Sequence, residues 1–218
     1  MAGLPGACIR RQCTIDQNGN GRYDKGGCRH KSTGKAGEAL RNKKELLFVV
    51  QQHQAMYLHW DFRLEMDGLL VSWALPDGPS INPKEKRLAF RVEDHDFRYK
   101  DFEGIIPGND YASGKVLIWD RGSYEPQNAG TVCNLHEKWL STGRLELTLH
   151  GTKLKGAWII YRTAAKLYGE DTWCLCKKAD TFSGTVEIVT AAPRSVVSGK
   201  TIGEITAADG VFDLNNYR

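Results

Sequence analysis

The fold of this 218-residue chain is decided by the run Leu46-Leu-Phe-Val-Val-Gln51 and its continuation, His53-Gln-Ala-Met-Tyr-Leu-His59-Trp-Asp61-Phe-Arg63. The first run is rich in β-branched and aromatic residues, a composition that favours a strand. From His59 onward, polar residues alternate with apolar ones. In a strand, His59, Asp61 and Arg63 would therefore share one side, about 6–7 Å apart per step. The pattern predicts strands with several polar groups gathered on one face.

Further stretches of strand length follow along the chain. They are Leu69–Leu75, Arg87–Glu93, Lys115–Trp119, Arg144–Leu149, Ala157–Arg162 and Thr172–Cys176. Turn signals such as Asp67-Gly68 separate them. Helical periodicity is confined to short pieces near residues 36–44 and 134–140. Many short, evenly spaced strands indicate an antiparallel sandwich or a closed barrel. We favour a mainly β protein, a small antiparallel β-barrel with a few short flanking helices.

Composition divides the chain into three parts. Residues 1–45 form an N-terminal arm rich in Gly, Lys and Arg, residues 46–180 carry the strands, and residues 181–218 form a loosely attached C-terminal extension. Two weaker patterns lie in the arm. A zinc site would use Cys8, Cys13, Cys28 and His30, but the close C-x2-C knuckle is absent, so incidental cysteines are the alternative. Residues 16–27 imitate a calcium loop without its final glutamate, and a turn-rich arm is the alternative.

The bulk numbers limit the class of protein. The net charge is +4, from 30 basic and 26 acidic residues, which is compatible with nucleic acid without requiring it. No apolar run approaches the roughly 18–20 residues of a membrane span, and no secretory signal is evident. We therefore expect a cytoplasmic, intracellular protein with no membrane partner. A phosphate-cradling G-x-x-x-x-G-K-[ST] loop and a G-x-S-x-G elbow are both missing from the sequence.

The polar residues of the opening stretch predict a metal site. His53, His59 and Asp61 offer two imidazoles and a carboxylate, a set that suits a divalent transition metal and leaves positions open for water and substrate. Arg63 alongside suits a phosphate, because its planar fork meets two oxygens at once. Two alternatives stay open. The same set also fits a mononuclear iron oxygenase, and the residues would equally form an ion pair and ordinary histidine hydrogen bonds.

A second polar island, Glu93-Asp-His95-Asp-Phe-Arg-Tyr99, ends a predicted strand. His95 is a candidate general acid for a leaving alkoxide, or a hydrogen-bond donor to a phosphoryl oxygen. Tyr99 is a candidate donor to the same phosphate. A solvated charged loop is the alternative.

Three segments together resemble the 3′-phosphoesterase domain of DNA ligase D and its stand-alone relatives. The first runs from Phe48 to Gly68. The second comprises Ser72-Trp-Ala-Leu-Pro-Asp-Gly-Pro-Ser80 and continues through Lys86-Arg87 to Val92-Glu-Asp-His95. The third runs from Asp101-Phe-Glu-Gly-Ile-Ile-Pro107 to Val116-Leu-Ile-Trp-Asp-Arg-Gly122. The combination is far more specific than any one piece and covers about residues 46–180.

The resemblance implies a small barrel with flanking helices that trims 3′ ends during break repair. Such domains use manganese, with Zn²⁺ or Co²⁺ as other candidates here. They remove a 3′-terminal ribonucleoside and then the remaining 3′-phosphate from DNA or RNA-tipped DNA ends. The family's metal ligands fall on His53, His59 and Asp61, and its phosphate contacts on Arg63, His95, Tyr99 and Arg87. Separate ligase, polymerase and end-binding repair proteins are the implied partners.

The chain departs from the family pattern in two places. Asp77 stands where the family commonly has a lysine, so a basic contact to nucleic acid is missing or comes from elsewhere. The family's early Arg-Asp pair and Glu-Pro have no clean match, and Arg22, Asp24 and Glu38 are the candidates for that role. These departures keep open a non-catalytic module of the same fold that binds nucleic-acid ends.

Overall fold

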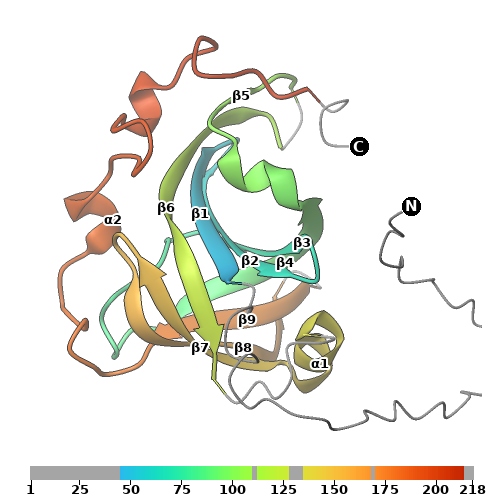
Figure 1. Ribbon diagram of the computed structural model, residues 1–218, viewed down its shortest axis with the longest axis vertical. Helices are drawn as coiled ribbons and strands as arrows, with labels where there is room; N and C mark the ends of the chain where they lie inside the picture. The colour runs from blue at the N-terminus through green and yellow to red at the C-terminus, as the bar shows by residue number, and fades with distance from the viewer. Residues whose placement is uncertain (1–44, 110–111, 128–134, 168–169, 214–218) are drawn as a thin grey trace, which may run out of the picture. The chain divides into compact units, whose positions relative to one another are not determined.

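A computed structural model describes residues 45–109, 112–127, 135–167 and 170–213, and its strands form one antiparallel sheet (Figure 1). The strands are β1 (Leu46–Gln54), β2 (Leu58–Met66), β3 (Leu69–Leu75), β4 (Arg87–Asp96), β5 (Gly104–Ile106), β6 (Gly114–Pro126), β7 (Arg144–Gly151), β8 (Lys155–Leu167) and β9 (Glu170–Lys177). The helical pieces are α1 (Leu135–Thr142), α2 (Ile188–Ala191) and the 3-10 turns η1 (Phe97–Asp101) and η2 (Ile202–Glu204).

Eight of these strands close into a barrel. Their order is β1-β2-β3-β4-β9-β8-β7-β6, and β6 returns to pair with β1. The short strand β5 adds to the first residues of β6 outside this ring. The prediction of a mainly β, antiparallel barrel with few short helices is confirmed. Closure matters for the site because it holds β1 between two hydrogen-bonded neighbours, β2 and β6.

Local backbone geometry sets how β2 turns into β3 and how closely β6 approaches β1. Asp67 and Gly68 join β2 to β3 with φ angles of 52° and 89°, the positive values that tight two-residue hairpins require. Gly114 begins β6 at φ 148°, and a Cβ there would lie 2.1 Å from the carbonyl oxygen of Gln54. Only glycine therefore allows β6 to start this close to the end of β1.

The two faces of the barrel wall differ in what covers them. One face carries the large apolar core, with Phe48, Phe62, Trp73 and Trp119 all nearly inaccessible to solvent. Residues of the opposite parity lie on the other face, where η1 and its neighbours form a second, smaller cluster. That cluster consists of Leu70, Tyr99, Phe102 and Val116, with Phe97, Ile106 and Phe212 packed against it. The second cluster covers the wall beside the polar residues of β1 and β2.

Most predicted elements are present, and several strands are longer than predicted. The stretch Leu69–Leu75 forms a strand with the expected bounds, and the helix expected near residues 134–140 is α1. Strand β5 was not predicted, because three residues carry too little alternation to be recognised. The helix expected at 36–44, the zinc and calcium patterns, and the candidates Arg22, Asp24 and Glu38 lie outside the described residues.

The C-terminal segment runs along the β6 side of the barrel (Figure 1). Ile205 is fully buried, and the indole of Trp119 donates a hydrogen bond to the Ala192 carbonyl at 2.8 Å. The Val196 amide donates to the Ile118 carbonyl at 3.1 Å. These contacts attach residues 188–205 more firmly than their weak sequence pattern indicates. None of the helices in the described part of the chain is long and apolar enough to cross a membrane.

Candidate metal centre

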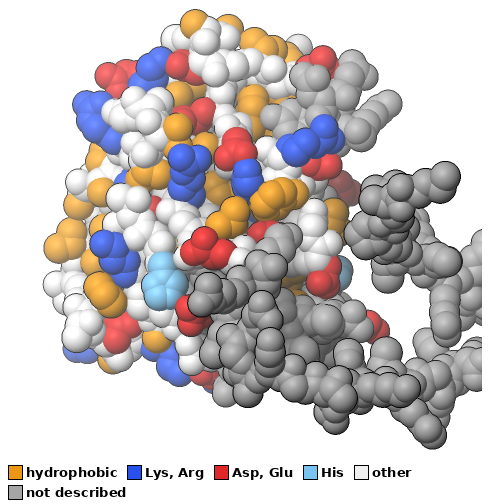
Figure 2. Space-filling model, viewed as in Figure 1, with side chains coloured by type: hydrophobic (Ala, Val, Ile, Leu, Met, Phe, Trp, Pro, Cys, Tyr) orange, Lys and Arg blue, Asp and Glu red, His pale blue; other side chains and the backbone are white. Residues whose placement is uncertain are grey.

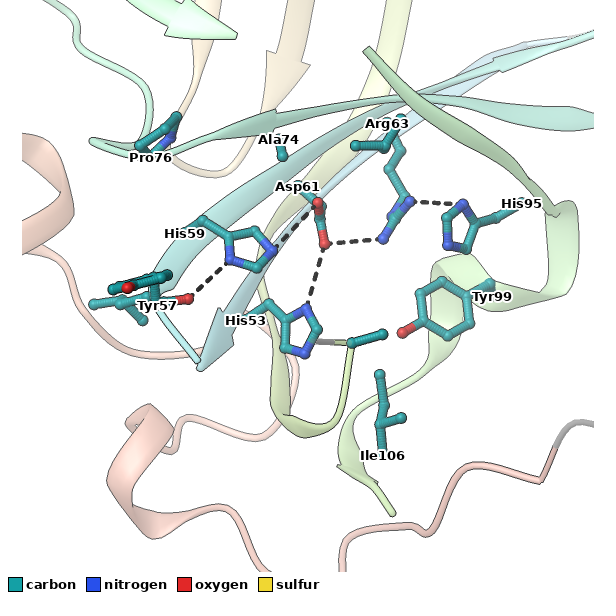
Figure 3. A pocket seen from close by; sticks show the side chains of 13 residues that line it. His53, Tyr57, His59, Asp61, Arg63, Ala74, Pro76, His95, Tyr99 and Ile106 are labelled. Atoms are coloured by element: carbon teal, nitrogen blue, oxygen red, sulfur yellow. Dashed lines mark hydrogen bonds and ion pairs between the residues drawn. The ribbon is translucent and has the colours of Figure 1, made fainter. Parts of the chain in front are cut away.

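Register brings the predicted metal ligands together on the face opposite the large core. His53 of β1 pairs directly with His59 of β2, and Asp61 lies two residues further along β2, on the same side. Nδ1 of His53 lies 3.8 Å from one carboxylate oxygen of Asp61, and Nε2 of His59 lies 3.7 Å from the other. One ligand atom from each residue lies within 4.8 Å of the others. Figure 3 shows the three side chains pointing toward a common centre.

These distances fit a shared metal ion better than direct hydrogen bonds. Separations of 3.7 and 3.8 Å exceed the range of a nitrogen–oxygen hydrogen bond. They approach the roughly 3.4 Å expected between two ligands that each lie about 2.1 Å from a tetrahedral ion. Burial, helped by the neighbouring His59 and Arg63 and opposed by Asp61, lowers the pKa of His53 to about 4. His53 is therefore neutral near pH 7, as a metal ligand must be.

The orientation of His59 is fixed by its own turn. Its Nδ1–H donates a hydrogen bond to the carbonyl of Tyr57 at 3.0 Å. The proton therefore stays on Nδ1, and the lone pair of Nε2 faces Asp61. Such a backbone hydrogen bond is the usual support of a metal-binding imidazole.

Arg63 organises the polar face of the wall. It is 3% exposed, and four of its five N–H groups have partners within the described residues. Its Nη2 donates to Asp61 at 3.0 Å, Nε donates to the Gln51 side-chain oxygen at 2.8 Å, and Nη1 lies 2.8 Å from the Ser72 hydroxyl and 3.0 Å from Nδ1 of His95. Arg63 therefore does not have a free pair of N–H groups for the bidentate phosphate contact that the sequence suggested. Its charge faces the pocket, but its fork already binds protein groups.

Two residues that the sequence did not single out complete this network. Gln51 is fully buried, and its amide nitrogen donates to the carbonyls of Tyr99 and Phe102 at 3.1 and 3.0 Å. It therefore links Arg63 to η1. Ser72 is also fully buried, and its hydroxyl donates a hydrogen bond to the Leu70 carbonyl at 2.8 Å. A sequence signal did exist, because both are polar residues inside otherwise apolar strands.

His95 and Tyr99 come to the same pocket from the far side of Arg63. Burial first, and then the charge of Arg63, lowers the pKa of His95 to about 4, so its ring is neutral near pH 7. Nδ1 of His95 lies 3.0 Å from Nη1 of Arg63. Because a guanidinium only donates, Nδ1 accepts this bond in the tautomer that carries the ring proton on Nε2. The same Nδ1 lies 2.9 Å from the Glu93 carbonyl, a bond that it can make only as a donor. Protonating Nδ1 would therefore cost the bond from Arg63.

Tyr99 packs under this network. The Arg63 guanidinium lies 5.1 Å from the centre of its ring, and the His95 ring lies 5.2 Å away. The Tyr99 hydroxyl points into the pocket from the side opposite His59 (Figure 3). The alternative, in which residues 93–99 form only a solvated charged loop, does not hold for His95 and Tyr99, since both line the pocket.

The pocket has a volume of about 470 Å³ and brings together six of the seven predicted site residues. They are His53, His59, Asp61, Arg63, His95 and Tyr99. Arg87 does not line the pocket, and its guanidinium is paired with Glu85 at 2.8 Å and Glu187 at 2.5 Å. Asp77, where the resemblance leads us to expect a lysine, is exposed and also lies outside the lining.

Comparison with known sequences identifies the family of this chain. The sequence profile of the DNA ligase D 3′-phosphoesterase domain matches residues 51–162. The chain belongs to this family.

Named relatives carry the same domain within longer chains. The multifunctional non-homologous end joining protein LigD of Pseudomonas aeruginosa is 42% identical over 161 residues, which cover 72% of this chain and 18% of the relative. The LigD proteins of Mycobacterium bovis and Mycolicibacterium smegmatis are each 42% identical over 116 and 119 residues, 53% and 55% of this chain and 14% and 16% of theirs. The chain thus spans less than a fifth of the length of these relatives.

Proposed function

We propose that this chain is a metal-dependent 3′-phosphoesterase that heals nucleic-acid ends during break repair. Its substrates would be DNA or RNA-tipped DNA 3′ ends, from which it removes a 3′-terminal ribonucleoside and the 3′-phosphate. The observation that carries the proposal is the convergence of His53, His59 and Asp61 beside a buried Arg63, in a domain of a phosphoesterase family. We further propose that residues 46–180 are the catalytic domain, between an N-terminal arm and a C-terminal extension.

His53, His59 and Asp61 would hold the metal, with manganese as the first candidate and Zn²⁺ or Co²⁺ as the others. When bound, the ion supplies positive charge to a phosphoryl oxygen and to an attacking water. The three residues leave coordination positions open on the pocket side, where a phosphate must enter. The neutral state of His53 near pH 7 keeps its lone pair available for this role.

Arg63, His95 and Tyr99 would bind the phosphate. Arg63 contributes its charge and one remaining Nη2–H, which stabilises negative charge spreading over phosphoryl oxygens. His95 is neutral near pH 7, and in the tautomer that accepts from Arg63 it carries its proton on Nε2, so we assign it a hydrogen bond to a phosphoryl or leaving oxygen. The Tyr99 hydroxyl is a second donor. A role for Arg87 in substrate binding remains a prediction without support from the geometry.

The cellular setting follows from the relatives. Their names place them in non-homologous end joining, and their greater length leaves room for further activities beside this domain. We therefore propose ligase, polymerase and end-binding repair proteins as partners, inside the cell. Figure 2 shows basic and acidic side chains interspersed on the face in view.

A primer with a 3′-phosphate tests the proposal directly. Phosphate release is measured with manganese, zinc, cobalt or no metal, and then repeated on a primer with a single 3′-ribonucleoside. We expect release that depends on the metal and is lost in Asp61→Ala, because this substitution removes a ligand and its charge. Asp101→Ala is the matched control, since Asp101 is an exposed aspartate outside the pocket. An unchanged manganese-dependent rate in Asp61→Ala would refute the metal assignment.

One observation favours a second candidate, a non-catalytic module that binds nucleic-acid ends. Asp77 puts a negative charge where the family has a basic residue, which weakens attraction for a phosphate backbone. The same assay separates the two functions. Tight binding of the 3′-phosphate primer without release supports the module, whereas metal-dependent release supports the enzyme. The oxygenase alternative loses its support, because the family is a phosphoesterase family.

A further inference from the structure

The turn between β1 and β2 carries apolar side chains into solvent. Met56 is 72% exposed, Tyr57 is 78% exposed and Leu58 is 43% exposed. Isolated exposed apolar residues are common, so exposure by itself assigns no role. Tyr57, however, lies next to a candidate metal ligand, His59.

Tyr57 belongs to the pocket and is tied to a candidate metal ligand. Its side chain lines the pocket together with Leu58, whereas Met56 does not. Its carbonyl accepts the hydrogen bond from Nδ1 of His59 at 3.0 Å, so the turn cannot move independently of that imidazole. In Figure 3, Tyr57 lies at one end of the pocket, beyond His59, and Tyr99 lies at the other end.

The two ends of the pocket differ in chemistry. The Tyr99 end presents Arg63 and His95, which suit a phosphate. Away from Arg63 and His95 the lining is apolar and includes the exposed Tyr57 together with Leu58 and Pro76. Figure 3 shows Tyr57 and Pro76 on the His59 side of the site. A nucleoside has the same division, because its base is separated from its 3′-phosphate by one sugar. With the phosphate at the metal centre, the base would lie toward one end of the pocket, and the apolar end suits it.

We propose that Tyr57 is a stacking platform for the nucleobase at the 3′ end of the bound strand. The base concerned is on the nucleoside whose 3′ oxygen carries the phosphate held at the metal centre, so the inference rests on the proposed function. Stacking on an aromatic ring accepts every base, since each has a π face. This tolerance suits a protein that must process ends of any sequence.

Fluorescence of 2-aminopurine tests the proposal. An oligonucleotide carries 2-aminopurine at its 3′ terminus and a non-hydrolysable 3′-phosphonate, and a matched one carries an abasic site there. Binding is measured with manganese. We expect quenching of the fluorophore by the wild-type protein and by Tyr57→Phe, which keeps the ring, but little quenching by Tyr57→Ala. Affinity for the base-bearing end should fall about tenfold in Tyr57→Ala, within the range measured for loss of one stacking partner.

Two comparisons make the result specific. Affinity for the abasic end should be the same in wild type and Tyr57→Ala, and Met56→Ala should behave as wild type on both ends. Equal losses on the two ends, or full quenching in Tyr57→Ala, would overturn the proposal. The measurements need no turnover. Failure to release phosphate would therefore reject the proposed activity alone, whereas absence of quenching by the wild type would reject the platform, whatever the activity.

Discussion

The two faces of the β1–β2 hairpin are equally buried but are stabilised by different forces. On one face, Phe62 and Leu64 are fully inaccessible and pack into the large apolar core. On the other, Asp61 and Arg63 are 5% and 3% exposed and are satisfied by hydrogen bonds. An apolar side chain tolerates a replacement of similar volume, whereas a buried charge leaves its partner unpaired when it is removed. The polar face should therefore respond more sharply to substitution.

Arg63→Ala should have the largest effect. It removes four hydrogen bonds and leaves Asp61 as an uncompensated buried charge, so the free energy of unfolding should fall by about 3–5 kcal/mol. Phosphate release should fall by about 100-fold or more, as after loss of a charge-stabilising donor. Urea unfolding and the 3′-phosphate assay measure the two effects. Arg63→Lys should recover only part of each, because an ammonium cannot reproduce the planar fork. Wild-type stability in Arg63→Ala would contradict the organising role.

Phe62→Ala breaks the apolar face of the same strand. We expect a loss of about 3–5 kcal/mol in the free energy of unfolding, from lost burial and the cavity left behind. Manganese affinity of the folded protein, measured calorimetrically well below the unfolding midpoint, should stay near that of the wild type. Phe62→Leu, which keeps most of the volume, should cost less than half as much. A metal affinity that falls together with stability would show that the two faces are not independent.

Gln51→Ala should have a smaller effect, confined to the polar face. The substitution removes the bonds from Gln51 to the carbonyls of Tyr99 and Phe102 and its contact with Arg63. The free energy of unfolding should fall by about 1–3 kcal/mol, because buried partners are left unsatisfied. Since η1 holds Tyr99, kcat should fall while manganese affinity changes little. Gln51→Glu tests the geometry separately, because it keeps the acceptor and loses the donor. Unchanged kcat in Gln51→Ala would argue against positioning through η1.

The most gradual effect is the dependence of stability on pH. The folded pKa of His95 is about 4, below the unfolded value of about 6.5. Between these pH values the unfolded chain binds a proton that the folded chain does not. The free energy of unfolding should therefore fall as the pH is lowered from 6.5 to 4, by at most about 1.4 kcal/mol per pH unit for one proton.

His95→Asn should make that fall shallower, as measured by urea unfolding across the pH range. His150→Asn is the matched control, since His150 is half exposed on β7, away from the pocket. In the metal-free protein, the lowered pKa of His53 contributes to the same loss of stability at low pH. An equal slope in wild type and His95→Asn would contradict the buried, neutral state of His95.

Much of the site could be predicted because strand geometry is local. Alternation along residues 58–66 suffices to put His59, Asp61 and Arg63 on one side, and the structure has them there. Arg87 was expected at the site but does not line the pocket. It is the first residue of β4, and its guanidinium pairs with Glu85 and Glu187. Gln51 and Ser72 escaped notice because their importance depends on Arg63, a partner 12 and 9 residues away.

The sequence by itself determined the strands, the antiparallel barrel class and the parity of the site residues, since these follow from backbone geometry and the pattern of apolar residues. Only the tertiary structure decided that the polar face is buried, that four N–H groups of Arg63 bind protein, and that His95 is neutral. The physical reason is distance along the chain. Closure of β1 on β6 and the packing of η1 join residues tens of positions apart, and their mutual burial sets hydrogen bonding and pKa together.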